Sequence, residues 1–448
     1  MKVRVRGWLR RAEIDRAIAY GLAGRTFSII SGPITVLLIA SRFSGELQGY
    51  YYTFNSLLGL QAFVELGLTT VVTQFASHEW ARLSLHPERG TVEGDTDALS
   101  RLVSLGRVAS TWFAVASVLS MAGLGAGGFY FFSQTPSHGI DWQAPWIALC
   151  VLSAANLFLL PVFSLLEGCN QVSTVYAYRS TQVVLANAAA WATMWLGGGL
   201  WAAPAYHATA LAAALIFLLG RYRTFLAPFL RPPKGPVLSW RADLLPMQWR
   251  LAIGYLFSYF TFGVFTPLMF HYRGAVVAGQ MGLTMTLVLL VGTIAALWSS
   301  TKAPQFGMLI ARKAYAELDR VFLRVAIRAE GVLFGGGLAA WLGIVILYET
   351  GLPVAQRFLP PLPTLLLVGG MVLGNFCSPM VVYMRAHKRE PYVVLSVTVA
   401  VLTGVSAWLM AMRSGPTGVA AAYFAISALV SLPGGLLIFL RRRREWHA

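Results

Sequence analysis

The chain has 448 residues, of which 57% are hydrophobic and only 12% are charged, and its mean hydropathy is +0.63. This composition excludes a water-soluble chain of two or three domains, which would carry about twice as much charge. The net charge of +17 could suit a nucleic-acid-binding protein, but the positive residues lie in short segments between apolar runs. We therefore expect a protein of the lipid bilayer that binds no nucleic acid.

Apolar runs of about twenty residues follow one another along the whole chain. Each is long enough to cross a hydrocarbon core of ~30 Å as a helix. The pattern predicts an all-α integral membrane protein with about twelve transmembrane helices. The expected helices cover residues 18–41, 49–75, 101–132, 144–167, 174–197, 201–220, 247–270, 276–301, 327–349, 364–386, 391–412 and 417–440.

The distribution of Lys and Arg sets the expected orientation. If both termini are cytoplasmic, the inner segments hold 29 of the 35 positive residues and the outer loops hold four. Positive residues accumulate on the cytoplasmic side of membrane proteins. We therefore expect cytoplasmic termini and an even number of spans.

The two halves of the chain carry similar landmarks in the same order. Gly49 and Gly279 open the second and eighth expected helices, 230 residues apart. Both halves begin in the cytoplasm, as in a parallel repeat. These matches predict two pseudo-symmetric six-helix lobes, 1–220 and 247–448, joined by a basic, proline-rich linker, 221–246, at the inner membrane surface.

Residues 306–326 carry apolar residues on one side and arginines on the other. This pattern fits an amphipathic helix at the membrane surface, and it fits an extension of the ninth span equally well.

Two ionisable residues stand well inside expected spans, where charges are costly and are often functional. Arg25 lies about seven residues into the first helix and Glu65 about ten residues from the inner end of the second. They could form a buried ion pair that fixes packing. Alternatively, Arg25 could bind a phosphate, for which its guanidinium is suited, while Glu65 restrains it or carries a coupling proton.

Uncharged polar residues and prolines inside the spans are further candidates. Asn55, Gln61 and Asn156 are candidate substrate-binding residues, although such side chains also bond neighbouring helices. Pro161 and Pro379 interrupt the fourth and tenth expected helices and are candidate hinges.

Enzyme signatures are lacking in the sequence. The pair Asp95 and Asp97 resembles a metal-binding Asp-x-Asp motif, but its loop is too short to hold a sugar nucleotide. Cys150, Cys169 and Cys377 have no His or Asp partners at ligand spacing. We expect no catalytic residues, no metal site and no cofactor.

Residues ~20–79 carry an Arg near the start of the first helix, then Gly-x-x-x-Gly-Tyr-Tyr from Gly45 and Glu-Leu-Gly-Leu-Thr-Thr from Glu65. This run resembles the polysaccharide transporter branch of the MOP exporter superfamily, which contains the Wzx-type O-antigen flippases. The turn after the fourth helix, from Glu167, is similar to that family too.

The resemblance implies a MATE/MOP-like fold and no enzymatic activity. It implies a flippase that moves an undecaprenyl-pyrophosphate-linked oligosaccharide, an O-antigen or exopolysaccharide repeat unit, from the inner to the outer leaflet. The mechanism would be alternating access driven by H+ or Na+, and we expect a monomer. Lipid II flippases have the same fold and would have a second basic residue in the first helix. This chain has Ser31 and Gly32 there, which argues against a lipid II flippase. The alternatives are a multidrug or cation antiporter of the same superfamily and a membrane polysaccharide polymerase or ligase.

Overall fold

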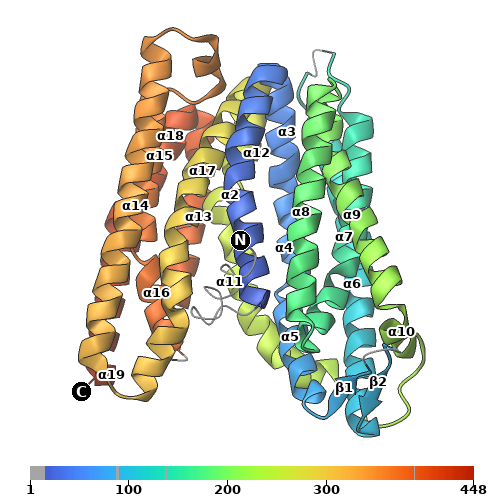
Figure 1. Cartoon of the computed structure of the whole chain (residues 1–448). Coiled ribbons are helices and arrows are strands. Elements are labelled where there is room, and N and C mark those ends of the chain that lie inside the picture. Colours follow the sequence, from blue (N-terminus) through green and yellow to red (C-terminus); the bar gives the residue numbers. More distant parts are fainter. Residues whose placement is uncertain (1–15, 87–89, 137–138, 388, 448) are drawn as a thin grey trace, which may run out of the picture. The chain divides into compact units, whose positions relative to one another are not determined.

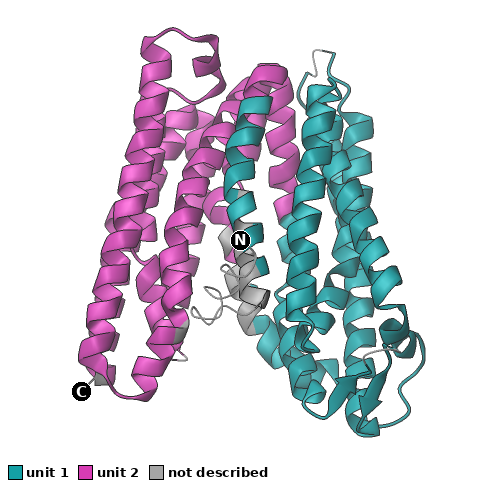
Figure 2. Cartoon of the chain, in the orientation of Figure 1, with its two compact units in different colours: residues 1–38, 60–255 teal, residues 39–59, 256–448 magenta. Residues whose placement is uncertain are grey.

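The computed structural model describes residues 16–86, 90–136, 139–387 and 389–447. Within this part, a few side chains fall outside the description, mostly in α2 (Arg16–Arg42) and α11 (Leu245–Phe262). The described chain is almost wholly helical and divides into two compact units (Figure 2). Unit 1 comprises Met1–Leu38 and Leu60–Tyr255, and unit 2 comprises Ile39–Gly59 and Leu256–Ala448.

Unit 1 is a bundle of long helices with a short hairpin at one end (Figure 1). Its core combines buried aliphatic residues of α5 with α6, α7 and α9, for example Val72, Leu105, Leu166 and Leu218. Its elements besides most of α2 are α4 (Ala62–Glu65), α5 (Leu68–Trp80), β1 (Leu83–Leu85), β2 (Val92–Gly94), α6 (Thr96–Ser133), α7 (Gln143–Gly168), α8 (Val172–Trp195), η2 (Gly199–Trp201), α9 (Ala202–Arg221), α10 (Arg223–Leu226), η3 (Ala227–Leu230), η4 (Trp240–Leu244) and the start of α11.

Unit 2 is also helical, and several of its apolar segments are interrupted. The break between α11 and α12 follows Phe262, that between α15 and α16 lies at Phe376 and Cys377, and η6 is a π-helical turn within the last segment. Its elements besides the end of α11 are α3 (Gly45–Leu58), α12 (Phe265–Arg273), α13 (Ala275–Ala311), α14 (Tyr315–Glu349), η5 (Pro353–Arg357), α15 (Pro361–Asn375), α16 (Ser378–Ala386), α17 (Val393–Arg413), α18 (Gly415–Ile426), η6 (Ser427–Ser431) and α19 (Leu432–His447).

The described residues form eight helices that are long and apolar enough to cross a membrane, or nine if α3 to α5 count as one broken span. These nine correspond to nine of the twelve expected spans. The first, fifth and seventh expected spans are helical as α2, α8 and the pair α11–α12, and within α2 the described residues Ile29–Arg42 form a shorter apolar helix. The prediction of an all-α membrane protein is confirmed.

Of the two alternatives for residues 306–326, a separate surface helix is wrong, and the extension of the ninth span is confirmed for residues 315–326. Helix α13 continues to Ala311, and α14 begins at Tyr315 after a tight turn in which Lys313 has φ 55°. The apolar stripe of this segment packs inside unit 2, with Phe306 and Val321 buried beside Tyr383. The segment therefore extends the two long helices of a hairpin.

The glycines that marked the sequence repeat meet each other inside unit 2. A Cβ atom added to Gly49 of α3 would lie 1.8 Å from the carbonyl oxygen of Ala275, and one added to Gly279 would lie 2.9 Å from the Gly49 nitrogen. Beside them, the buried amide of Gln48 donates to the carbonyls of Gly279 (2.8 Å) and Arg357 (2.9 Å). Helix α3, from the first half of the sequence, is therefore fixed to α13 of the second half.

The basic linker lies along α6 in unit 1. The hydroxyls of Ser100 and Ser104 accept hydrogen bonds from the backbone nitrogens of Gly235 (2.9 Å) and Leu238 (3.2 Å). Trp240 packs on Trp112 with ring centroids 5.4 Å apart. These contacts place residues 235–240 against the beginning of α6.

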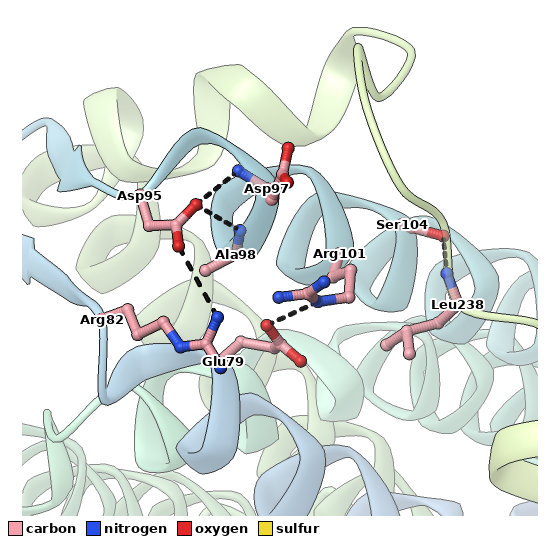
Figure 3. Close-up of polar contacts among 8 residues, drawn as sticks. All are labelled: Glu79, Arg82, Asp95, Asp97, Ala98, Arg101, Ser104 and Leu238. Carbon is pink, nitrogen blue, oxygen red and sulfur yellow. Dashed lines mark hydrogen bonds and ion pairs between the residues drawn. The ribbon is translucent and has the colours of Figure 1, made fainter.

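Charged side chains surround the start of α6 (Figure 3). Asp95 caps the helix by accepting hydrogen bonds from the backbone of Asp97 and Ala98, and these bonds lower the pKa of its carboxyl group. Arg101 pairs with Glu79 of α5 at 2.9 Å. The aspartate pair that resembled a metal motif therefore begins a helix, as expected for an Asp at this position.

Candidate functional site

The second expected span is broken at Leu66 and Gly67 in unit 1. Helix α4 ends at Glu65, and α5 begins at Leu68. Leu66 has φ 49° and Gly67 φ 68°, so both occupy the left-handed region, which is uncommon for a leucine. Broken helices in transporters leave backbone groups without helical partners at binding sites. The break is the first reason to place a candidate site here.

Glu65 lies at this break. Its carboxylate accepts a hydrogen bond from the Thr69 hydroxyl at 2.6 Å, and the residue is half-buried. The Trp112 indole donates to the carbonyl of Val64 at 3.1 Å. These contacts hold a carboxylate and an irregular backbone segment in fixed geometry, which suits binding of a proton or a small cation.

Gln61 ties the same segment to α7. Its amide donates to the hydroxyl of the buried Ser153 at 3.0 Å. The hydroxyl of Thr73, farther along α5, contacts the carbonyl of Ser164 on α7 at 3.2 Å. The broken span is therefore bonded to α7 on both sides of the break.

Asn156 has a structural role in the described contacts. Its side-chain amide donates to Leu152 on its own helix at 2.8 Å and to the carbonyl of His207 on α9 at 2.9 Å. Both amide protons are then engaged, so Asn156 could contact a substrate only through its oxygen atom or after a rearrangement.

Asn156→Leu is expected to lower the free energy of unfolding by about 1 kcal/mol, because it removes a bond between two helices. Thermal unfolding in detergent measures the effect. Asn187→Leu is the matched control, since the Asn187 amide donates to Val183 of its own helix. An equal loss of stability in both variants would contradict the assigned role.

Two other candidates have no described contact with this group. Asn55 lies on α3 in unit 2, where it is exposed and donates to the carbonyl of Tyr51 at 2.8 Å. Arg25 lies on α2, but its side chain is outside the described residues. The ion pair between Arg25 and Glu65 therefore stays a prediction.

The two prolines differ in their surroundings. Helix α7 runs without a break through Pro161, so the expected interruption is absent there. Pro379 lies in the first turn of α16, directly after the break at Phe376 and Cys377. A proline is well tolerated at such a position. The hinge roles stay predictions.

Sequence reasoning missed Glu330, a carboxylate in the membrane-length helix α14. One of its carboxylate oxygens is buried and accepts no hydrogen bond from the described residues. It lies only three residues inside the expected ninth span, too close to the expected boundary to stand out as an intramembrane charge. The described residues contain no group of three or more His, Cys, Asp or Glu that could hold a metal ion.

Solved structures with the same arrangement of helices are transporters. Lipid II flippase MurJ in an inward closed conformation covers 95% of this chain and 87% of its own, with a TM-score of 0.56 and 13% identity. A multidrug resistance MATE family transporter of the MOP superfamily, in an inward-facing conformation, covers 92% of this chain and 99% of its own, with a TM-score of 0.53 and 13% identity. The chain has the MOP fold.

Another MATE structure, in complex with MaL6, covers 96% of this chain and 95% of its own at a TM-score of 0.52 and 14% identity. A scan against protein-family models found no match, and a search of curated protein sequences found no similar one. At these identities the likeness establishes the fold of the chain.

Proposed function

We propose that this protein is an ion-coupled flippase for undecaprenyl-pyrophosphate-linked oligosaccharide, which it moves from the inner to the outer leaflet by alternating access. The observation that carries the proposal is the broken second span with Glu65 at the break. The same segment supplies the sequence motifs that resemble the polysaccharide transporters. One part of the chain thus supports both the coupling and the family of substrate.

The charge of the chain supports an anionic substrate. The sequence has 35 basic residues against 18 acidic ones. An anionic head group needs an attractive path through the protein, and a guanidinium binds phosphate oxygens in a two-pronged geometry. We assign the contact with pyrophosphate to Arg25, and contacts with the glycan to Asn55 and Gln61, with Asn156 available through its oxygen.

Two carboxylates are available for coupling to a cation gradient. Glu65 lies at an irregular backbone segment, and Glu330 has a buried oxygen without a described partner. Intramembrane carboxylates of this kind carry protons or cations in many transporters. We propose Glu65 as the coupling residue, with H+ or Na+ as the ion, and Glu330 as the second candidate.

A multidrug antiporter is the second candidate function, because MATE transporters share the fold. Such a protein would bind cations, whereas the flippase would bind the pyrophosphate of the lipid carrier. Purified protein should bind undecaprenyl pyrophosphate more tightly than ethidium, as measured by tryptophan fluorescence. Tighter binding of ethidium would favour the antiporter. Elongation of lipid-linked repeat units on incubation would instead indicate a polymerase or ligase.

The proposed location is the bacterial inner membrane, with a monomer whose termini are both cytoplasmic. Cysteines introduced at the exposed positions Gln134 and Val354 are expected to react with an impermeant maleimide added to intact cells. A cysteine at the exposed Gly235 in the linker should react only after lysis. The native cysteines are buried, so background labelling is low. Labelling at Gly235 in intact cells would refute the orientation.

A further inference from the structure

Three arginines of α14 form a line on the exposed side of this helix. Arg320, Arg324 and Arg328 are each exposed and follow one another at intervals of four residues. Residues four apart on a helix lie above one another on one face, ~6 Å apart along the axis. We call these three residues the arginine stripe. It lies wholly within unit 2.

The same face of α14 continues as an apolar surface toward the other end of the helix. Ile327 is 62% exposed, Phe334 62% and Ile346 60%. The opposite face is buried in the unit, at Val321, Val325 and Leu333 among others. A large exposed apolar face on a membrane-length helix is expected to contact lipid. The arginine stripe therefore lies at one edge of an apolar surface that faces the bilayer.

The position of the stripe along α14 matches the head-group layer. From Arg328 to Glu349 the helix rises by about 32 Å, close to the hydrocarbon thickness of a bilayer. The guanidinium Nε atoms of Arg320 and Arg324 contact carbonyls four residues earlier, each at 3.3 Å. These two side chains thus bend toward the N-terminal, inner end of the helix, which is how arginine places its charge at the membrane surface.

No acidic residue neutralises the stripe among the described contacts. The ion pairs at this end of unit 2 join Arg443 to Asp319, Arg441 and Arg442 to Glu445, and Arg385 to Glu390. Glu317 lies one turn before Arg320 on the same face, but it takes part in none of these ion pairs. The turn before α14 adds the exposed Arg312 and Lys313.

We infer that the arginine stripe is a binding site for the phosphate of an anionic phospholipid in the inner leaflet. Guanidinium groups bind phosphate oxygens through paired hydrogen bonds, and basic residues beside a membrane helix attract anionic lipids. The acyl chains of the bound lipid would cover the apolar face that includes Ile327 and Phe334. The inference requires no particular transport substrate and stands apart from the proposed function.

Binding of phosphatidylglycerol to the purified full-length protein, measured by native mass spectrometry, tests the inference. The double variant Arg324→Gln/Arg328→Gln should bind phosphatidylglycerol on the order of tenfold more weakly than the unchanged protein. Arg324→Lys/Arg328→Lys, which keeps the charge, should retain most of the binding. The matched control is Arg441→Gln/Arg442→Gln, which removes two charges at the same end of the unit and should bind normally.

Two further outcomes are decisive. Phosphatidylcholine should bind equally to all variants, and inorganic phosphate should not displace phosphatidylglycerol, since the site is built for a lipid. Equal phosphatidylglycerol binding by the glutamine variant and the unchanged protein would overturn the inference. So would displacement by inorganic phosphate at the same concentration as the lipid.

Discussion

Arg25→Gln is expected to abolish transport while the protein still inserts and folds. The residue lies within α2, and burying a guanidinium in a membrane span costs at least ~2.5 kcal/mol, which a bound phosphate would offset. Loss of the two-pronged contact with pyrophosphate should lower the transport rate by about 100-fold or more. Arg25→Lys should restore only part of it, because lysine keeps the charge and loses the fork.

The double variant Arg25→Ala/Glu65→Ala separates this role from a packing role. If the arginine served only to neutralise Glu65, removing both would restore folding and transport. If Arg25 binds pyrophosphate, transport should fail in the single and the double variant alike. The control Arg413→Gln, an exposed arginine at the end of α17, should transport normally. Full transport by a well-expressed Arg25→Ala protein would remove Arg25 from the site.

Gly49→Ala is expected to lower the free energy of unfolding by about 3 kcal/mol, at the upper end of the usual cost of overpacking. The added Cβ would fall 1.8 Å from a backbone oxygen of Ala275, and the backbone cannot move aside as a flexible side chain could. Chemical denaturation in detergent, or the temperature of unfolding, measures the loss.

Gly123→Ala is the matched control for this change. Gly123 lies on α6 with open space around its Cα atom, so alanine should stabilise the helix by up to about 1 kcal/mol. The two substitutions make the same chemical change with opposite expected signs. Equal stabilities of the two variants would contradict the close approach of α3 and α13.

The positions of the helices could be predicted from the sequence because a membrane imposes length and hydropathy on every span. Interruptions of a helix within a span could not be predicted in this way. The break at Leu66 and Gly67 lies in a segment whose hydropathy does not fall. The glycine in Glu-Leu-Gly was read as part of a family motif, yet it was also the one local sign that the helix ends.

Contacts between residues that are far apart along the chain could not be predicted from the sequence either. Gln61 bonds Ser153, 92 residues later, and Asn156 bonds the backbone at His207. The polar character of these residues predicted a buried partner or a substrate, and it could not distinguish the two. The close packing of Gly49 on α13 joins the two halves of the sequence. Similarity between the halves gives no sign of such a contact.

The most direct test of the account is translocation of a lipid-linked oligosaccharide by the purified protein in proteoliposomes. A fluorescent undecaprenyl-pyrophosphate oligosaccharide would be placed in one leaflet, and its arrival in the other would be followed by access to a lectin, with and without an H+ or Na+ gradient. The account predicts gradient-accelerated translocation that is lost in Arg25→Gln and uncoupled from the gradient in Glu65→Gln. If proteoliposomes that exchange a cationic dye did not translocate the lipid-linked oligosaccharide, this result would contradict the account. The protein would then be an antiporter.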